Sequence, residues 1–303
     1  MNGRPQTGGL CDLATDRGIF AILAIDHRDS LRVLLDPSDP SAVPAIELTE
    51  FKRAVIEGAG GAASGVMLEP EYSIPQLVGD LPPGIGFLAA LEAQGYEGDP
   101  YARTTTLLDG WSVRHAAAAG ASGAKLLLFY TPEVRDAAAR QDALVRRVSA
   151  ECQSHGLPLF LEPLAYPARA ESGAGAPGER RRLVVETAQR LTSLGPSVLK
   201  LQFPADAVVD DQSGWADACA ELDSVVTVPW ALLSLGVSYV TFRLQVETAC
   251  RAGASGFMVG RAAWGELVAA EPATRRSMAA GLVSQRLTEL REIACDLGRP
   301  IER

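Results

Sequence analysis

The sequence predicts a (β/α)8 barrel, a closed ring of eight parallel strands in which a helix follows each strand. Three observations predict it: eight short apolar runs, amphipathic stretches with helical spacing between most of them, and ionisable or small residues after the runs. Repeated strand–helix units favour a parallel sheet, and eight such units point to a closed barrel. The chain of 303 residues is long enough for one large barrel, and we expect a single domain over residues 1–303.

Each predicted strand is a short apolar run bounded by glycine, proline or polar residues. The third unit is the least regular, because glycine and proline crowd the segment Leu81–Gly86. In chain order, the strands are expected at Ile19–Ile25, Gly65–Glu69, Ile85–Leu91, Ala124–Phe129, Leu157–Leu161, Val198–Phe203, Val225–Ala231 and Gly256–Val259.

The stretches between most of the strands repeat their apolar residues at helical spacing, which predicts helices that pack against the sheet. They are expected at Glu47–Glu57, Ser112–Ala119, Pro132–His155, Glu179–Leu194, Gly214–Leu222, Tyr239–Ala252 and, as the last helix, about Pro272–Leu297. A doubly wound open sheet is the alternative architecture. It is disfavoured because no GxGxxG sequence follows the first strand.

The C-terminal ends of the strands carry the chemistry in barrels of this kind. At almost every one of these positions the sequence places an ionisable or hydrogen-bonding residue, which a purely structural barrel does not need. In chain order, these residues are Asp26, His27, Arg28, Glu69, Glu92, Lys125, Glu162, Lys200, Ser234, Leu235, Gly236, Gly260 and Arg261; Lys125 and Lys200 lie within their strands, and the others lie at or just after the strand ends.

Lysine is rare in this chain, which has 28 basic residues but only three lysines, two of them inside predicted strands. If Lys125 and Lys200 both point into the barrel, their ammonium groups converge with the Glu162 carboxylate. Burial and a neighbouring cation would then lower the pKa of one lysine towards neutrality. A neutral lysine amine attacks ketones and forms a Schiff base, and Glu162 could move the protons. The alternative is a buried Lys–Glu pair that only positions strands; Lys52 is expected on a solvated helix face beside Arg53.

An anion site is predicted at the last two strand–helix connections. The segment Ser234–Ser238 (SLGVS) precedes the helix that begins near Tyr239, and backbone N–H groups at a helix N-terminus bind anions. Gly260 and Arg261 follow the next strand, and barrels often bind phosphate between these two connections. A capped helix and a surface arginine are the alternative reading. Arg28, on the first connection, could hold a second anion.

Composition excludes several classes of partner. A net charge of −9 and a pI near 5.0 disfavour nucleic acid and anionic membrane surfaces. The N-terminal residues lack an apolar signal segment, and the five cysteines form no CxxC pair, so we expect a reduced, cytoplasmic protein. His115 and His155 fall in predicted helices, which disfavours a histidine-based metal site, and no cofactor is expected. His27 is either a ligand contact, a proton carrier or a structural histidine.

Six segments, taken in order, resemble the main motifs of the class I tagatose-1,6-bisphosphate aldolases and the related sulfofructosephosphate aldolases. The resemblance covers about residues 17 to 266, and it is the ordered set that is specific. The segments are FAILAIDHRDSL, GASGAKLLLFY, LFLEPLAY, SVLKLQFP, PWALLSLGVS and GFMVGRAAW.

The resemblance implies a metal-independent barrel that cleaves a ketohexose 1-phosphate into dihydroxyacetone phosphate and a three-carbon aldehyde bearing a second anion. By motif, Lys200 resembles the Schiff-base lysine, Lys125 the second active-site lysine and Glu162 the acid/base group. Arg261, with the Ser234–Gly236 loop, resembles the site for the C1 phosphate. Arg28 resembles the residue near the anion at the far end of the substrate.

Two departures from the family pattern concern substrate identity. The family commonly has Asp-Gln-Arg where this chain has Asp26-His27-Arg28, and an acidic residue is usual at Gln202. Glu162 is the expected base for the C4 hydroxyl, with a substrate anion or Tyr130 as alternatives. The rival functions are a Schiff-base aldolase for another phosphorylated sugar, such as deoxyribose 5-phosphate, and a non-catalytic sugar-phosphate-binding regulator. A homo-oligomer, either a dimer or a tetramer, is expected from the apolar content of the helices.

Overall fold

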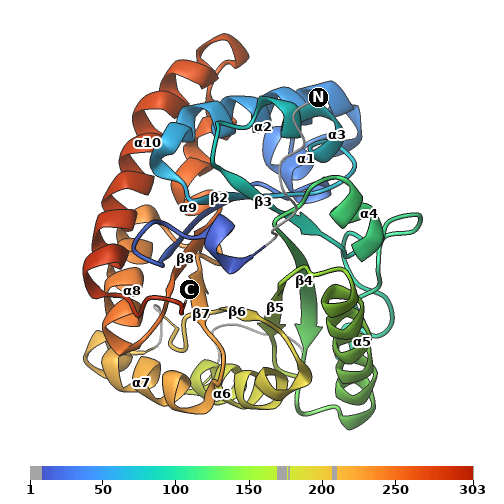
Figure 1. Ribbon diagram of the computed structural model, residues 1–303, viewed down its shortest axis with the longest axis vertical. Helices are drawn as coiled ribbons and strands as arrows, with labels where there is room; N and C mark the ends of the chain where they lie inside the picture. The colour runs from blue at the N-terminus through green and yellow to red at the C-terminus, as the bar shows by residue number, and fades with distance from the viewer. Residues whose placement is uncertain (1–8, 169–175, 177, 207–209, 303) are drawn as a thin grey trace.

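The computed structural model describes residues 9–168, 176, 178–206 and 210–302. Its eight strands close into a parallel barrel in which each strand pairs with its neighbours in sequence, and β8 pairs with β1 (Figure 1). The predicted (β/α)8 barrel is therefore confirmed. The strands are β1 (Phe20–Ala24), β2 (Gly65–Leu68), β3 (Gly86–Ala90), β4 (Gly123–Tyr130), β5 (Leu159–Ala165), β6 (Val198–Leu201), β7 (Trp230–Leu233) and β8 (Gly256–Val259).

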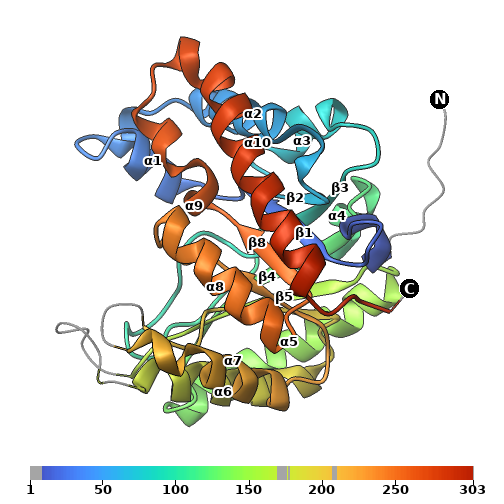
Figure 2. The same ribbon diagram turned by 90° about the vertical axis from the view of Figure 1, so that its left-hand side faces the viewer.

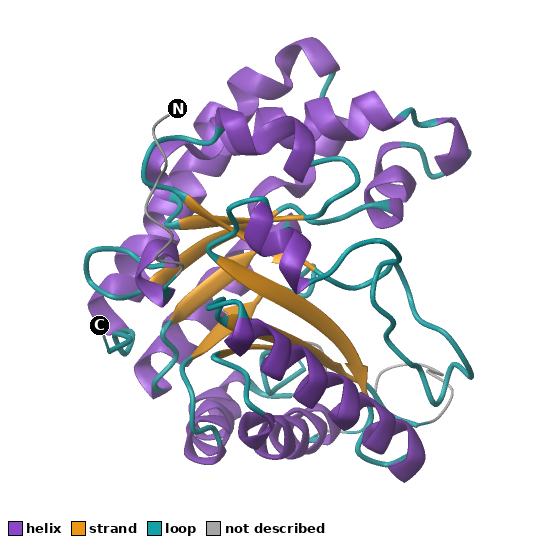
Figure 3. Ribbon diagram, turned by 45° about the vertical axis from the view of Figure 1, so that its right-hand side comes forward, coloured by secondary structure: helices purple, strands orange, loops and turns teal. Residues whose placement is uncertain are grey.

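Helices surround the barrel on its outer side (Figure 3). The α-helices are α1 (Asp29–Leu35), α2 (Ala45–Ala59), α3 (Ile74–Leu77), α4 (Val113–Ala118), α5 (Arg135–Ser154), α6 (Glu179–Leu191), α7 (Trp215–Val225), α8 (Tyr239–Ala252), α9 (Arg261–Trp264) and α10 (Pro272–Leu297). Short 3-10 helices lie at η1 (Leu10–Leu13), η2 (Pro40–Ala42), η3 (Gly60–Ala62), η4 (Val78–Asp80), η5 (Thr192–Leu194), η6 (Gln212–Gly214) and η7 (Gly265–Ala269). The long helix α10 packs against both α2 and α8 (Figure 2).

The seventh strand is the element whose predicted position is wrong. We expected it at Val225–Ala231, but α7 extends to Val225 and the strand begins only at Trp230. The run VVTV has high strand propensity, but it does not form the strand. Pairing of Leu199 with Trp230 and of Leu232 with Phe257 places the strand after this run. Strand five also runs longer than predicted, so that Glu162 lies within it.

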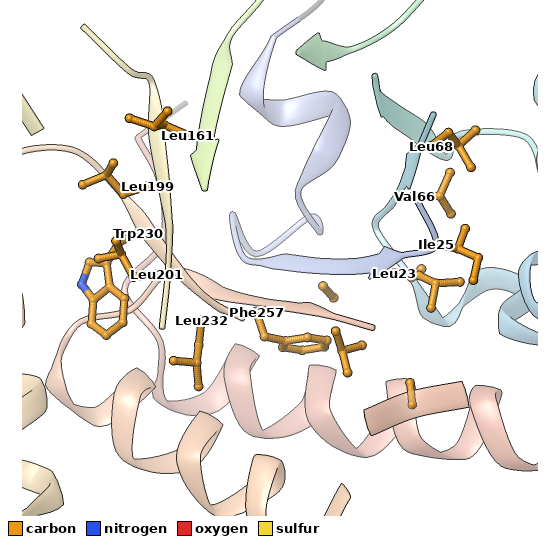
Figure 4. Packing of buried hydrophobic residues seen from close by; sticks show 14 of the residues in the cluster. Leu23, Ile25, Val66, Leu68, Leu161, Leu199, Leu201, Trp230, Leu232 and Phe257 are labelled. Carbon is orange, nitrogen blue, oxygen red and sulfur yellow. The ribbon is translucent and has the colours of Figure 1, made fainter. Parts of the chain in front are cut away.

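Alternate residues of the strands separate two apolar cores. Residues that point outward, such as Leu199 and Leu201 of β6, pack between the barrel and its helices (Figure 4). Residues that point inward, such as Phe20 and Val198, fill the barrel interior. Leu13 of η1 and Ile301 near the C-terminus belong to this inner core and close the N-terminal end of the barrel. Polar side chains lie at the opposite end of the barrel, at the C-terminal ends of the strands.

Within the described residues, no helix combines the length and the apolar character that crossing a bilayer requires. The same residues include no group of three or more His, Cys, Asp or Glu side chains placed to hold a metal ion.

Candidate active site

A cavity of about 280 Å³ opens at the C-terminal end of the barrel. Strand ends and the connections that follow them form its walls, and almost all of the predicted site residues lie there. Those that line it are Asp26, His27, Arg28, Glu92, Lys125, Glu162, Lys200, Ser234, Leu235, Gly236, Gly260 and Arg261. The exception among the strand-end residues is Glu69.

Two lysines and one glutamate meet inside the barrel, the arrangement expected if both lysines point inward. The Lys200 Nζ lies 2.8 Å from Glu162 Oε1, and the Lys125 Nζ lies 3.1 Å from Glu162 Oε2. All three side chains are more than nine-tenths buried. The Lys200 Nζ also lies 3.7 Å from the sulfur of Met67, which is a weak acceptor. Glu162 therefore connects the two amines.

The two lysines differ in how completely they are paired. Lys125 Nζ also lies 2.8 Å from Asp26 Oδ2 and 2.5 Å from Glu92 Oε1, so it faces three carboxylates. Burial opposes its charge, but Asp26, Glu162 and Glu92 together raise the pKa of Lys125 well above its usual range. The pKa of one of the two lysines was expected to fall, and Lys125 is not that lysine, because its three carboxylates favour the charged form. Among the residues that the structure describes, Lys200 forms an ion pair only with Glu162.

Asp26 is the counterpart of Lys125 at the end of β1. Burial favours its neutral form, but Lys125 and Lys200 outweigh burial and hold the pKa of Asp26 far below its usual range. Asp26 is therefore a fixed carboxylate. By contrast, Glu162 Oε2 is buried and has no hydrogen-bond donor among the described residues, since Lys125 approaches it without hydrogen-bond geometry. A bound hydroxyl group could satisfy this oxygen.

The predicted anion corner is formed by the ends of β7 and β8. Leu235 and Gly236 both adopt positive φ angles, of 45° and 78°, which turn the loop tightly above the strand ends. A Cβ atom at Gly236 would lie 2.7 Å from Nη2 of Arg261, so glycine allows the guanidinium to lie against this loop. Ser234 Oγ accepts a hydrogen bond from the Gly260 N–H, which ties the two connections together.

Arg261 has no ion pair and no hydrogen bond with any other residue that the structure describes. It is exposed at the start of α9 and lines the cavity. An unpaired guanidinium beside a turn of small residues can bind the oxygens of a phosphate. The corner thus has the composition that the sequence predicted.

Arg28 lines the cavity too, but carboxylate and carbonyl oxygens already occupy its guanidinium. Its Nη1 donates to Glu71 Oε2 at 2.8 Å and its Nη2 to the Glu92 carbonyl at 2.6 Å. Burial disfavours the charge, yet the hydrogen bond to Glu71 and the charges of Glu92 and Glu69 raise the pKa of Arg28. The sequence did not predict Glu71 as a partner, because it lies on the loop after β2, two residues beyond the strand-end position.

His27 precedes Arg28 in the chain and also lines the cavity. Its ring packs edge-on against Trp264, with centroids 5.0 Å apart. Its buried Nδ1 has no hydrogen-bond partner within the described chain and lies 4.0 Å from Asp26 Oδ1. Burial, only partly offset by Asp26, lowers the pKa of His27 to about 4, and Arg261 acts in the same direction. The imidazole is therefore neutral at pH 7, which disfavours a role as a second cation.

Lys52 corrects another prediction. Instead of lying on a solvated face, its side chain is fully buried and forms an ion pair with the equally buried Glu69. Its Nζ also donates to Ser73 Oγ at 3.1 Å. The scarcity of lysine, which indicates a special role for Lys125 and Lys200, applies equally to Lys52 and could have predicted its burial.

Tyr130 and Gln202 do not line the cavity. The Tyr130 hydroxyl donates to Asp142 Oδ1 on α5 at 2.8 Å, so it lies on the outer side of β4 and cannot serve as the base. Gln202 Oε1 accepts a hydrogen bond from the Ala165 N–H at 2.7 Å, which joins the ends of β5 and β6. A substrate-selecting role for Gln202 gains no support from this contact.

The family model that describes DeoC/LacD family aldolases matches residues 20–266. Tagatose 1,6-diphosphate aldolase 1 of Enterococcus faecalis is 30% identical over 271 residues, which cover 84% of this chain and 82% of that protein. Tagatose 1,6-diphosphate aldolase 2 of Streptococcus mutans is 28% identical over 275 residues, with the same two coverages.

Solved structures show the same fold at lower identity. An archaeal fructose 1,6-bisphosphate aldolase has a TM-score of 0.62 and 19% identity, and the match covers 95% of this chain and all of that chain. A fructose-bisphosphate aldolase from Plasmodium falciparum has a TM-score of 0.71 and 17% identity, with coverages of 96% and 94%.

Proposed function

This chain belongs to the DeoC/LacD family of aldolases and is a lyase, and we propose that it is a class I aldolase that acts through a Schiff base on Lys200. Its substrate is a ketohexose 1-phosphate, either 6-deoxy-6-sulfofructose 1-phosphate or tagatose or fructose 1,6-bisphosphate. The products are dihydroxyacetone phosphate and a three-carbon aldehyde. The observation that carries the proposal is the singly paired amine of Lys200, 2.8 Å from Glu162 inside a cavity edged by the unpaired Arg261. The names of the curated relatives support a sugar bisphosphate as substrate class.

The first half of the reaction makes the electron sink. Glu162 takes a proton from Lys200, and the freed amine attacks the C2 ketone to give a carbinolamine. Glu162 returns the proton to the C2 hydroxyl, which leaves as water, and the nitrogen becomes a protonated imine. The contact between Glu162 Oε1 and the Lys200 Nζ gives the shortest path for these transfers.

The second half breaks the C3–C4 bond. A base removes the C4 hydroxyl proton, the aldehyde forms, and the bonding electrons move to the imine to give an enamine. We assign this base to Glu162, because its Oε2 lacks a hydrogen-bond donor in the described chain. Protonation of the enamine at C3 and hydrolysis of the imine then release dihydroxyacetone phosphate and free Lys200.

The fixed charges position the substrate. Lys125 stays protonated between Asp26, Glu92 and Glu162, so it holds Glu162 in place and offers a cation to substrate oxygens. Arg261 and the Ser234–Gly236 loop would bind the C1 phosphate. Asp26 and His27 would contact the sugar hydroxyls, and Gly260 gives the ring of His27 room.

Borohydride trapping tests the proposal. The enzyme is incubated with each candidate ketose phosphate, reduced with borohydride and mapped by mass spectrometry. We expect one adduct, on Lys200, and the three lysines of the chain make the mapping unambiguous. An adduct on Lys125, or none on any lysine while cleavage proceeds, would contradict the assignment.

Two comparisons separate the rival functions. Cleavage of ketose 1-phosphates and of deoxyribose 5-phosphate, measured side by side in EDTA, distinguishes the proposed activity from another phosphosugar aldolase and from a metal-dependent one. Binding without turnover of any of these sugars would favour a regulator. The oligomeric state, predicted to be a dimer or tetramer, is checked by light scattering.

A further inference from the structure

The two arginines at the cavity are in opposite electrostatic states. Arg261 is exposed and unpaired in the described chain, so its charge is available to a ligand. The Arg28 side chain is 4% exposed, and both terminal nitrogens already donate to protein oxygens. An anion at the Arg261 end meets a free cation, whereas an anion at the Arg28 end meets a cation whose charge a carboxylate already balances.

Glu71 is the carboxylate that balances Arg28, and it approaches from outside the cavity. Its side chain is 40% exposed and does not line the cavity, while Arg28 does. Arg28 therefore has one side towards the substrate space and another towards Glu71. A ligand can approach Arg28 without displacing Glu71. The attraction between an anionic ligand and Arg28 is nevertheless weakened, because the negative charge of Glu71 offsets the positive charge of Arg28.

The position of Glu71 is built into the fold. The Glu69 carboxylate accepts the backbone N–H groups of Glu71 at 2.7 Å and of Tyr72 at 3.0 Å. Glu69 is in turn fixed by Lys52, in an ion pair whose two side chains are both fully buried. A buried pair that holds the loop by its backbone keeps Glu71 beside Arg28 whether or not a ligand is present.

The charges of this corner cancel. Arg28 and Lys52 contribute two positive charges, and Glu71 and Glu69 contribute two negative ones. The nearby Glu92 carboxylate shares the single cation of Lys125 with Asp26 and Glu162, so this group adds no net positive charge to the corner. A phosphate dianion placed at this end would lose hydration free energy, and no net positive charge would offset that loss. A hydroxyl group or a monoanion loses much less hydration free energy.

We infer that Glu71 is a specificity-determining residue, acting through Arg28 to select substrates whose end remote from C1 carries at most one negative charge. This inference rests on the proposed function, because it concerns the same cavity, and it narrows the substrate class. Of the candidate substrates above, it favours the one with a sulfonate at C6 over the two with a second phosphate.

The test compares kcat/KM for three ketohexose 1-phosphates that carry a hydroxyl, a sulfonate or a phosphate at C6. The wild-type enzyme is expected to cleave the 1,6-bisphosphate no better than the other two. Glu71→Gln leaves Arg28 uncompensated and should raise the ratio of bisphosphate to hydroxyl substrate about tenfold, mainly through KM. The control is Glu57→Gln on α2, which removes an ion pair with Arg276 of α10 and should leave the ratio unchanged.

Three outcomes would overturn the inference: a wild-type preference for the bisphosphate, an unchanged ratio in Glu71→Gln, or a ratio that falls. Glu71→Asp keeps the charge and should restore the wild-type ratio, which a purely structural role would not require. If the wild-type enzyme cleaves none of the three substrates and forms no borohydride adduct, the proposed function itself is refuted. The two failures are therefore distinguishable.

Discussion

The two ends of the barrel interior differ in chemistry although the same strands supply both. Phe160 and Val198 point into the apolar core near the N-terminal end. Two residues further along the same strands, Glu162 and Lys200 point into the cavity and form an ion pair. A single step of the strand repeat thus separates a residue that packs from a residue that reacts.

The difference shows which end stabilises the fold and which end is constrained by function. Apolar side chains at the lower end gain free energy by leaving water and need no specific partner. Each ion at the upper end is costly to bury alone, so the three carboxylates Asp26, Glu92 and Glu162 and the two lysines hold one another. Changes at the upper end should therefore alter rate far more than changes at the lower end, which should alter stability.

The largest expected effect is the loss of activity in Lys200→Arg. Arginine keeps the positive charge beside Glu162, but a guanidinium cannot form the imine. We expect kcat/KM to fall by about 10⁴-fold or more and the borohydride adduct to vanish. Circular dichroism should show an intact fold, and appreciable turnover in the variant would place the nucleophile elsewhere.

Glu162→Gln should have the next largest effect, because it keeps the shape of the side chain and removes its proton transfer. General acid–base catalysis typically contributes about 10² to 10⁴-fold, so a fall of this size in kcat is expected. The adduct on Lys200 should still form, but slowly. A variant with normal kcat would show that another group, such as a substrate anion, moves the protons.

At the other end, Phe20→Ala should lower stability and spare the chemistry. Phe20 is fully buried and packs edge-on against Phe160 with ring centroids 5.4 Å apart. Truncating such a ring costs about 3–5 kcal/mol of unfolding free energy. Denaturant titration measures the loss, while the kcat of the folded fraction should match the wild-type value. A large fall in kcat without loss of stability would contradict the division between the two ends.

The sequence predicted this division where periodicity alone decides it. The strand repeat of two places Lys200 on the same face of β6 as Val198, and the packing of Val198 in the inner core shows that this face points into the barrel. Because parallel strand ends meet at one rim, Lys125 and Glu162 could be predicted to join Lys200 without any knowledge of distances.

The rest depended on contacts that no local pattern encodes. Lys52 follows helical spacing beside Arg53, but its burial arises from Glu69, a residue on a different element. The partnership of Arg28 with Glu71 depends on how the loop after β2 folds back. The start of β7 at Trp230 depends on pairing with β6, which overrides the strand propensity of the preceding valines.

The smallest effect we predict is a change in pH dependence at His27. In the folded chain the pKa of His27 is about 4, against 6.5 for an exposed histidine, because burial disfavours the charged ring. Below pH 6.5 the unfolded chain therefore binds a proton that the folded chain does not, so the unfolding free energy falls as the pH drops from 6.5 towards 4. The contribution is at most about 3 kcal/mol and is absent above pH 7.

His27→Gln removes this titration and keeps a side chain able to hydrogen-bond. Denaturant midpoints measured from pH 4 to pH 8 should fall more steeply for the wild-type protein than for the variant between pH 6.5 and pH 4, because only the wild-type chain gains a proton on unfolding there. Carboxylates that do not contact His27 titrate alike in both proteins and cancel in the difference. Lost packing against Trp264 would add an offset that does not vary with pH, so it is separable from the proton effect. Parallel curves would show that His27 is no more difficult to protonate in the folded chain than in the unfolded chain. His27 would then belong with the charged side chains of the cavity.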